Sequence, residues 1–237
     1  MRGQVLAPLV AAVLGIGGGV ATAIVVAEDD APKAAPLSDP LRLGIPLVDL
    51  DCSGESLMVV GYGDTRAPLS SAVANRGTEG LHYLRTDQSC DTVLGPEGMP
   101  TPGYVVYLGP FDSRSEPCRI RMSGADSRSF VTVLRSGNQQ PVKCPCEIPS
   151  TEAPRLFLDM EPDQTETLWI RGLQTMFRDD DPEAFPGTAI TGDYDQATSD
   201  RVGFYQDDAP GRVTERGTVD AATWILLTDR LCRNYDY

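Results

Sequence analysis

A short pattern occurs twice near the C-terminus, and it constrains the fold more than any other feature of the chain. Residues 192–198 read GDYDQAT, and residues 217–223 read GTVDAAT. The glycine of each copy suits a tight turn whose geometry other residues resist. The aspartate, Asp195 or Asp220, then stands at a helix N-cap, where its carboxylate can accept the backbone N–H of the following threonine. Two helices that begin with the same device predict a small helical unit with internal pseudo-symmetry.

An apolar stripe at helical spacing runs through the residues around both copies. Such a stripe predicts helices that bury one face in a common core. A hydrophobic staple between Val219 and Trp224 would fix the start of the last helix. The members of the stripe are Leu173, Phe177, Val202, Tyr205, Trp224 and Leu227.

These blocks follow one another in a fixed order. An L-Q-x-x-F block at 173–177 precedes the first copy, a V-x-x-Y-Q block at 202–206 follows it, and T-W-x-x-L at 223–227 ends the second copy. The order resembles the peptidoglycan-binding module of bacterial cell-wall proteins, over about residues 160–232. The resemblance implies a three-helix module that binds peptidoglycan, through either its glycan or its stem peptide.

Candidate ligand contacts lie in and after the first copy. Gln206 follows the core position Tyr205, so we expect it at the edge of the apolar face with its amide free to bond a sugar or a peptide group. With the resemblance in view, Asp193, Tyr194 and Asp195 are the further candidates. A capping role is the alternative explanation for Asp195, as it is for Asp220.

The middle of the chain alternates strand-like and helix-like stretches. Their order, βαββαβ, is that of a ferredoxin-like fold. Ser113 and Glu116 have the spacing of a capping box and are expected to start the second helix. The predicted elements are strands at 56–62, 81–86, 104–111 and 130–134, and helices at 68–76 and after Ser113.

The third strand carries a second resemblance. Residues 104–113, YVVYLGPFDS, are similar to the V-x-[V/L]-G-P-F motif of the sporulation-related repeat (SPOR) domain. Domains of that family bind glycan strands stripped of peptide, so the resemblance implies a second contact with the wall. A strand-to-helix turn in any βαβ unit would explain the same glycine, proline and phenylalanine without a ligand.

The predicted fold class is therefore α+β: a ferredoxin-like βαββαβ middle domain followed by a small all-α three-helix module. Linkers are assigned from their proline content. The expected order is a transmembrane signal-anchor or signal peptide at 1–27, a linker at 28–41, the SPOR-like domain at 42–146, a linker at 147–159 and the peptidoglycan-binding-like domain at 160–237.

Cysteine usage indicates an oxidising compartment, because an even number of cysteines in an exported chain predicts disulfides. Cys144 and Cys146 are too close in sequence to pair with each other. Only Cys232 follows residue 147, so if all six cysteines pair within the chain, one bridge must tie the C-terminal module to the middle region. No metal site is expected, since His82 is the single histidine and has no partner at ligand spacing. The candidates for disulfides are Cys52, Cys90, Cys118, Cys144, Cys146 and Cys232.

The N-terminal stretch sets the expected location. Residues 5–27 carry no charge, with Arg2 before them and acidic residues 28–30 after them. Such a stretch is long enough to span a bilayer, with its positive end inside. A cleaved signal peptide is the alternative, because small residues at 21–23 and 25–27 suit cleavage. Either assignment places the remainder outside the cytoplasm, on the cell membrane or secreted to the cell wall.

Charge and motifs exclude several classes of function. A net charge of −14 argues against binding to nucleic acid or to anionic lipid, which leaves the N-terminal segment as the expected membrane contact. No nucleophile with a base and no catalytic motif occurs, so neither an enzyme nor a cofactor is expected. Paired carboxylates of a glycoside hydrolase are the remaining enzymatic alternative, since only geometry identifies such a pair.

Together these features predict a non-enzymatic bacterial cell-envelope protein that binds peptidoglycan through its C-terminal module. One alternative is an envelope scaffold or regulatory protein whose middle domain binds another envelope protein. The other is an unrecognised cell-wall hydrolase. Co-sedimentation with purified sacculi separates a wall binder from a protein binder, and release of soluble fragments identifies a hydrolase.

Overall fold

The computed structural model describes residues 39–90, 102–124, 128–136, 140–209, 211 and 215–233. All of them belong to one compact unit, Pro36–Tyr237. The expected membrane or signal segment, 1–27, lies outside the described residues, as does most of the first linker. Among the residues that are described, no helix is both long enough and apolar enough to cross a membrane.

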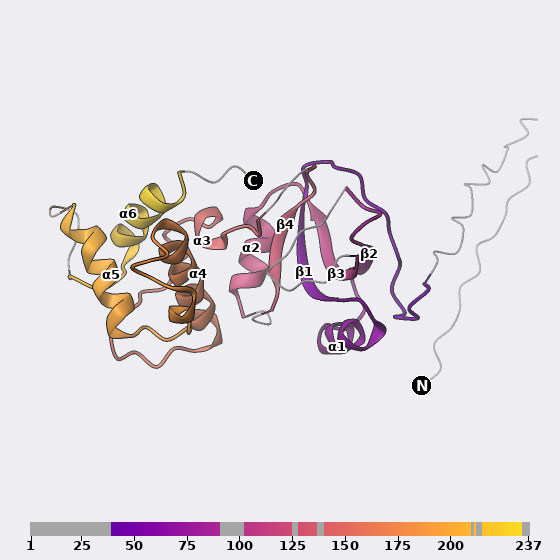
Figure 1. Cartoon of the computed structure of the whole chain (residues 1–237), viewed down its shortest axis with the longest axis horizontal. Coiled ribbons are helices and arrows are strands. Elements are labelled where there is room, and N and C mark those ends of the chain that lie inside the picture. Colours follow the sequence, from indigo (N-terminus) through magenta and orange to yellow (C-terminus); the bar gives the residue numbers. More distant parts are fainter. Residues whose placement is uncertain are drawn as a thin grey trace, which may run out of the picture. The chain divides into compact units, whose positions relative to one another are not determined.

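An antiparallel sheet of four strands organises the first half of this unit (Figure 1). The strand order is β2-β3-β1-β4, so β1 and β3 lie in the middle. Helix α1 follows β1 and helix α2 follows β3, which agrees with the predicted α+β class. The elements are β1 (Ser56–Gly63), α1 (Arg66–Arg76), β2 (Leu81–Arg85), β3 (Tyr104–Phe111), α2 (Ser115–Met122) and β4 (Phe130–Val133).

Both faces of the sheet are buried, which explains why β1 carries consecutive apolar residues instead of an alternating pattern. Met58 and Val60 point to one face and pack in a cluster with Leu69 and Val73 of α1. Leu57 and Val59 point to the other face and pack with residues of β3 and β4, among them Val105, Tyr107 and Phe130.

The predicted start of α2 is wrong. The helix begins at Ser115 with Arg114 at its N-cap, and no side chain caps it, so the capping box of Ser113 and Glu116 does not form. A start at Ser113 would place Pro117 where the helix needs a backbone N–H. The observed start puts Pro117 in the first turn, where the N–H has no intrahelical partner.

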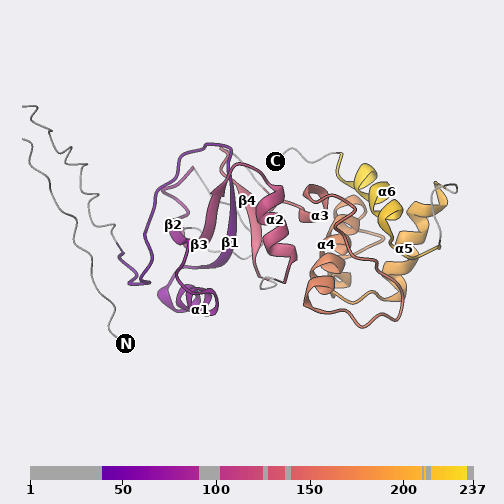
Figure 2. The same ribbon diagram turned by 180° about the vertical axis from the view of Figure 1, so that it is seen from behind.

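Helices dominate the second half of the unit, and α4, α5 and α6 lie together in both views (Figure 2). Asp163 and Glu166 form a capping box at the start of α4. Asp195 and Asp220 cap α5 and α6, as the repeated pattern predicts. The elements are α3 (Cys144–Glu147), α4 (Gln164–Asp180), the short 3-10 helix η1 (Gly187–Ala189), α5 (Gln196–Asp207) and α6 (Ala221–Leu231).

One apolar core joins these helices to α2 and β4, because it includes Met122 and Val131 together with residues of α4, α5 and α6. Helix α3 lies against α4 so closely that a Cβ on Gly172 would stand 2.7 Å from Cγ of Pro145. The stretch predicted as a linker, 147–159, contributes the buried residues Ile148 and Leu156 to the same core. The second half of the unit therefore includes residues that proline content alone assigns to a linker.

Disulfides pair all the cysteines of the chain: Cys52–Cys90, Cys118–Cys144 and Cys146–Cys232. Cys144 and Cys146 have different partners, and Cys146–Cys232 ties the end of α6 to α3. Both predictions about pairing are confirmed. Three disulfides are typical of a protein outside the cytoplasm.

Candidate functional site

A strap of residues 154–160 crosses the C-terminal helices just before α4. Leu156 is fully buried and forms an antiparallel bridge with Val219, with backbone N···O distances of 2.9 and 2.8 Å. The carbonyl of Pro154 accepts a hydrogen bond of 2.8 Å from Nε1 of Trp224. The next two residues, Phe157 and Leu158, are 42% and 37% exposed. Because Leu156 is anchored in the core, the next two side chains, both large and apolar, are held at the surface.

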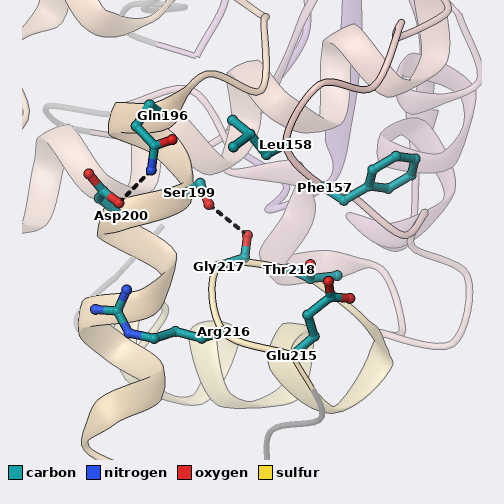
Figure 3. Close-up of a pocket in the computed structure, with 9 residues that line it drawn as sticks. All are labelled: Phe157, Leu158, Gln196, Ser199, Asp200, Glu215, Arg216, Gly217 and Thr218. Carbon is teal, nitrogen blue, oxygen red and sulfur yellow. Dashed lines mark hydrogen bonds between the residues drawn. The ribbon is translucent and has the colours of Figure 1, made fainter.

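A groove of about 380 Å³ lies between this strap, helix α5 and the turn before α6 (Figure 3). Its volume is within the range of small-molecule and peptide sites. The strap supplies an apolar wall, whereas α5 and the turn supply polar and charged side chains. The lining residues are Phe157 and Leu158 from the strap, Gln196, Ser199 and Asp200 from α5, and Glu215, Arg216, Gly217 and Thr218 from the turn.

Gly217 opens the second copy of the repeated pattern and lines the groove, together with Thr218 of the same copy and Gln196 of the first copy. Its φ is +77°, and a Cβ there would stand 2.3 Å from Oγ of Ser199, so both conformation and space require glycine. The hydroxyls of Tyr194 and Ser199 donate to its carbonyl oxygen at 2.7 and 3.2 Å. Its N–H donates to Oε1 of Gln206 at 2.6 Å. Every polar atom of this glycine is therefore fixed.

Gln206 is buried, and the expectation that its amide is free is wrong. Only 2% of the residue is exposed. Besides accepting from Gly217, its amide nitrogen donates to the carbonyl of Thr218 at 2.8 Å and to Oγ1 of Thr223 at 3.1 Å. The glutamine therefore clamps the turn that leads into α6, and a role in ligand binding would act through Gly217 and Thr218.

Gln174 makes the same clamp on the first copy of the pattern. Its Oε1 accepts from the N–H of Gly192 at 2.9 Å. Its amide nitrogen donates to the carbonyl of Asp193 and to Oγ1 of Thr198, both at 3.0 Å. The sequence carries a signal for this pair, because a glutamine on the preceding helix stands before each copy.

The other predicted contact residues lie behind or beside the groove. Tyr194 is buried, burial raises the pKa of its hydroxyl, and its hydrogen bond supports Gly217. Asp195 is exposed and caps α5 with a 2.8 Å bond from the Thr198 N–H. Asp193 is exposed and belongs to the first turn. None of the predicted contact residues lines the groove, and their direct role in binding stays a prediction.

Charges around the groove are largely compensated. Glu215 pairs with Arg155 at 2.8 Å, and Arg216 pairs with Asp207 through two bonds of 3.0 and 3.1 Å. The hydrogen bond and charge of Asp207 raise the pKa of Arg216, and the hydrogen bond from Arg216 lowers the pKa of Asp207. Asp200 accepts a 2.8 Å hydrogen bond from Nε2 of Gln196. The side of the groove formed by α5 and the turn therefore presents polar groups of fixed orientation, opposite the apolar side formed by the strap.

Sequence reasoning missed the groove itself. The strap lies in a proline-rich stretch that reads as a linker, although its consecutive Phe157 and Leu158 are an apolar signal within it. In the sequence, Ser199 and Asp200 are two polar residues of a helix and look like ordinary surface, although Ser199 is buried in the structure. Within the described ranges of the chain, no cluster of three or more histidine, cysteine or acidic side chains is placed to hold a metal ion.

No protein-family model matches the chain, and neither a curated protein nor a solved structure matches it. The residues of the groove and the sequence blocks that surround it are therefore the basis for assigning a function to the chain.

Proposed function

We propose that the chain is a non-enzymatic protein of the bacterial cell envelope that binds peptidoglycan in the groove between the strap, α5 and the turn before α6. The observation that carries the proposal is the position of this groove. Seven of its nine lining residues lie within the stretch 160–232 that resembles the peptidoglycan-binding module, and the other two, Phe157 and Leu158, lie just before it. An apolar wall that faces fixed polar groups suits a polymer that carries both methyl groups and amides.

The finer architecture is part of the same proposal. The strand order β2-β3-β1-β4 and the connections β1-α1-β2 and β3-α2-β4 support a ferredoxin-like assignment for the middle region. Helices α4, α5 and α6 with their repeated caps support a three-helix peptidoglycan-binding-like module. The N-terminal residues 5–27 would anchor the protein in the membrane or direct its export, and the disulfides agree with a location outside the cytoplasm.

Co-sedimentation with purified sacculi tests the proposal. The protein used should run from Pro36 onwards, because this part of the chain is one compact unit. We expect wild-type protein to pellet with sacculi and to remain soluble without them. We expect a dissociation constant in the micromolar range or higher, since a groove of this size buries little surface.

Variants of the strap locate the site. Phe157→Ala and Leu158→Ala should each weaken binding, because both remove apolar surface from the groove wall. Phe204→Ala and Ile225→Ala are the matched controls, since these residues are 51% and 47% exposed and lie outside the groove. Equal losses from strap and control variants would refute this groove as the site.

Two further outcomes would replace the proposed function. If wild-type protein does not pellet with sacculi but captures an envelope protein, the chain is a scaffold or regulator. If incubation releases soluble wall fragments, it is a hydrolase. Circular dichroism of each variant shows that the fold is retained before its binding is compared.

A further inference from the structure

The groove contains one carboxylate that has no salt-bridge partner in the described part of the chain, although its charge still acts on Arg216 and, after that of Asp207, helps to raise the pKa of that guanidinium. Asp200 is exposed on α5, and among the residues that the structure describes it forms no ion pair within 4.0 Å. The other charges of the lining are paired: Glu215 with Arg155, and Arg216 with Asp207. The groove therefore carries a net negative charge in a protein whose total charge is −14, which disfavours anionic ligands and favours a cation.

Asp200 is also held in place by its neighbour. Nε2 of Gln196 donates to Oδ1 of Asp200 at 2.8 Å, across one turn of α5 (Figure 3). This bond occupies one carboxylate oxygen and leaves Oδ2 available for a ligand. A carboxylate that is already oriented loses less side-chain entropy when it binds a charged group.

The strap supplies the complementary surface. Leu158 lines the same groove as Asp200 and is 37% exposed. An aliphatic chain that ends in an ammonium group fits such a pair, because its methylene groups can cover the leucine while its charged end reaches the carboxylate. An ammonium group on a sugar ring lacks the aliphatic chain and is surrounded by hydroxyls, so it matches the apolar wall less well.

We infer that the groove recognises the amino-bearing side chain of a diamino acid in the stem peptide of peptidoglycan, with Asp200 bound to its ammonium group and Leu158 against its methylene groups. This inference rests on the proposed function. It adds the chemical group that is bound, and it makes binding dependent on a free amine. Glycan strands without peptides are then poor ligands for this groove.

Acetylation of the sacculi tests the inference, because acetic anhydride converts free amines into uncharged amides. Wild-type protein should bind acetylated sacculi about twofold to fivefold more weakly than untreated sacculi, the range expected for an exposed ion pair. Asp200→Asn should bind untreated sacculi with the same loss and show no further loss on acetylated sacculi. Added salt should weaken wild-type binding more than binding by the variant.

Matched controls separate this effect from general charge. Asp229→Asn changes the net charge equally, and Asp229 is exposed on α6 outside the groove, so this variant should bind as wild type does. Glycan strands freed of their stem peptides by an amidase, added as competitors to untreated sacculi, distinguish a peptide amine from a glucosamine amine. These strands should displace wild-type protein from the sacculi poorly, whereas soluble fragments that keep their stem peptides should displace it.

The possible failures are distinguishable. If wild-type protein does not bind untreated sacculi, the proposed function fails. If it binds them, but neither acetylation nor Asp200→Asn weakens binding, the proposed function stands and the inference about the amine is overturned. If peptide-free strands displace the protein and stop doing so only when they are acetylated, the cation belongs to the glycan and the inference is also overturned.

Discussion

The two copies of the repeated turn share the same internal hydrogen bonds and differ in the side chains that cover them. A buried glutamine of the preceding helix bonds the glycine N–H and the following carbonyl in each copy: Gln174 at Gly192 and Gln206 at Gly217. An aspartate then caps the next helix in each copy. The two copies therefore share the same set of hydrogen bonds, which fixes the turn and caps the helix that follows it.

The difference arises at one helix position. Arg171 precedes Gln174 by the same spacing as Gly203 precedes Gln206. Arg171 lies against the first turn: its Nη2 donates to the carbonyl of Thr191 at 3.1 Å, and a Cβ on Gly192 would stand 2.8 Å from its Nε.

Gly203 has no side chain to place on the second turn. Arg216, which belongs to that turn, lies over Gly203 instead, since a Cβ on Gly203 would stand 2.8 Å from Cζ of Arg216. The edge formed by Ser199 and Gly217 is left as part of the groove wall. The repeated residues thus explain stability, and the residues that break the repeat determine where a ligand can bind.

Removing the two clamps should give the largest effects on stability. Gln174→Ala and Gln206→Ala should each lower the free energy of unfolding by about 2–3 kcal/mol, because each leaves the N–H of the clamped glycine without its partner and removes the other hydrogen bonds of a buried amide. Urea denaturation measures both. Gln164→Ala is the control, since Gln164 is exposed and makes a single hydrogen bond to Gly124. A large loss in one clamp variant and almost none in the other would show that the copies are not equivalent.

The glycines should respond unequally. Gly217→Ala should cost about 2–3 kcal/mol, because a positive φ disfavours alanine by about 1–2 kcal/mol and the new methyl group meets Ser199. Gly192→Ala should cost less, since its nearest contacts, Nε of Arg171 and Cγ2 of Thr167, are at 2.8 Å instead of 2.3 Å. Adding Ser199→Ala to Gly217→Ala should recover part of the loss. Thermal unfolding decides the order, and a greater loss at Gly192 would contradict it.

The caps should contribute the smallest and most similar effects. Asp195→Ala and Asp220→Ala should each lower the free energy of unfolding by about 1 kcal/mol, and replacement by asparagine should cost much less. Urea denaturation of the four variants measures these changes. If neither alanine variant lowers the free energy of unfolding, the two aspartates do not stabilise the protein as caps.

The repeated pattern predicted much of the C-terminal half because its information is local. The glycine conformations and the caps at Asp195 and Asp220 depend on residues within one turn of each other. Counting cysteines on either side of residue 147 was enough to predict a bridge to Cys232. The strand pattern likewise predicted the elements of the α+β class. It did not predict the start of α2, which is set by the need to place Pro117 in the first turn of the helix.

Long-range partners account for what the sequence did not predict. Leu156 reads as part of a linker until its pairing with Val219 is known. Helical spacing places Gln206 beside a core residue correctly, but its partners are in the following turn, and no local rule reveals that they bury it. The groove depends on both facts together, so its lining residues could not be predicted from periodicity.

The most direct test of the account is a nuclear magnetic resonance titration of isotope-labelled protein with soluble peptidoglycan fragments that retain their stem peptides. The account predicts that backbone amide signals of Leu158, Asp200 and Gly217 shift with added fragment, whereas those of Gly192 and Asp193, in the first copy, do not. Shifts confined to the first turn around Gly192 and Asp193, or no shifts at all under conditions where sacculi are bound, would contradict the claim that the second turn carries the binding site.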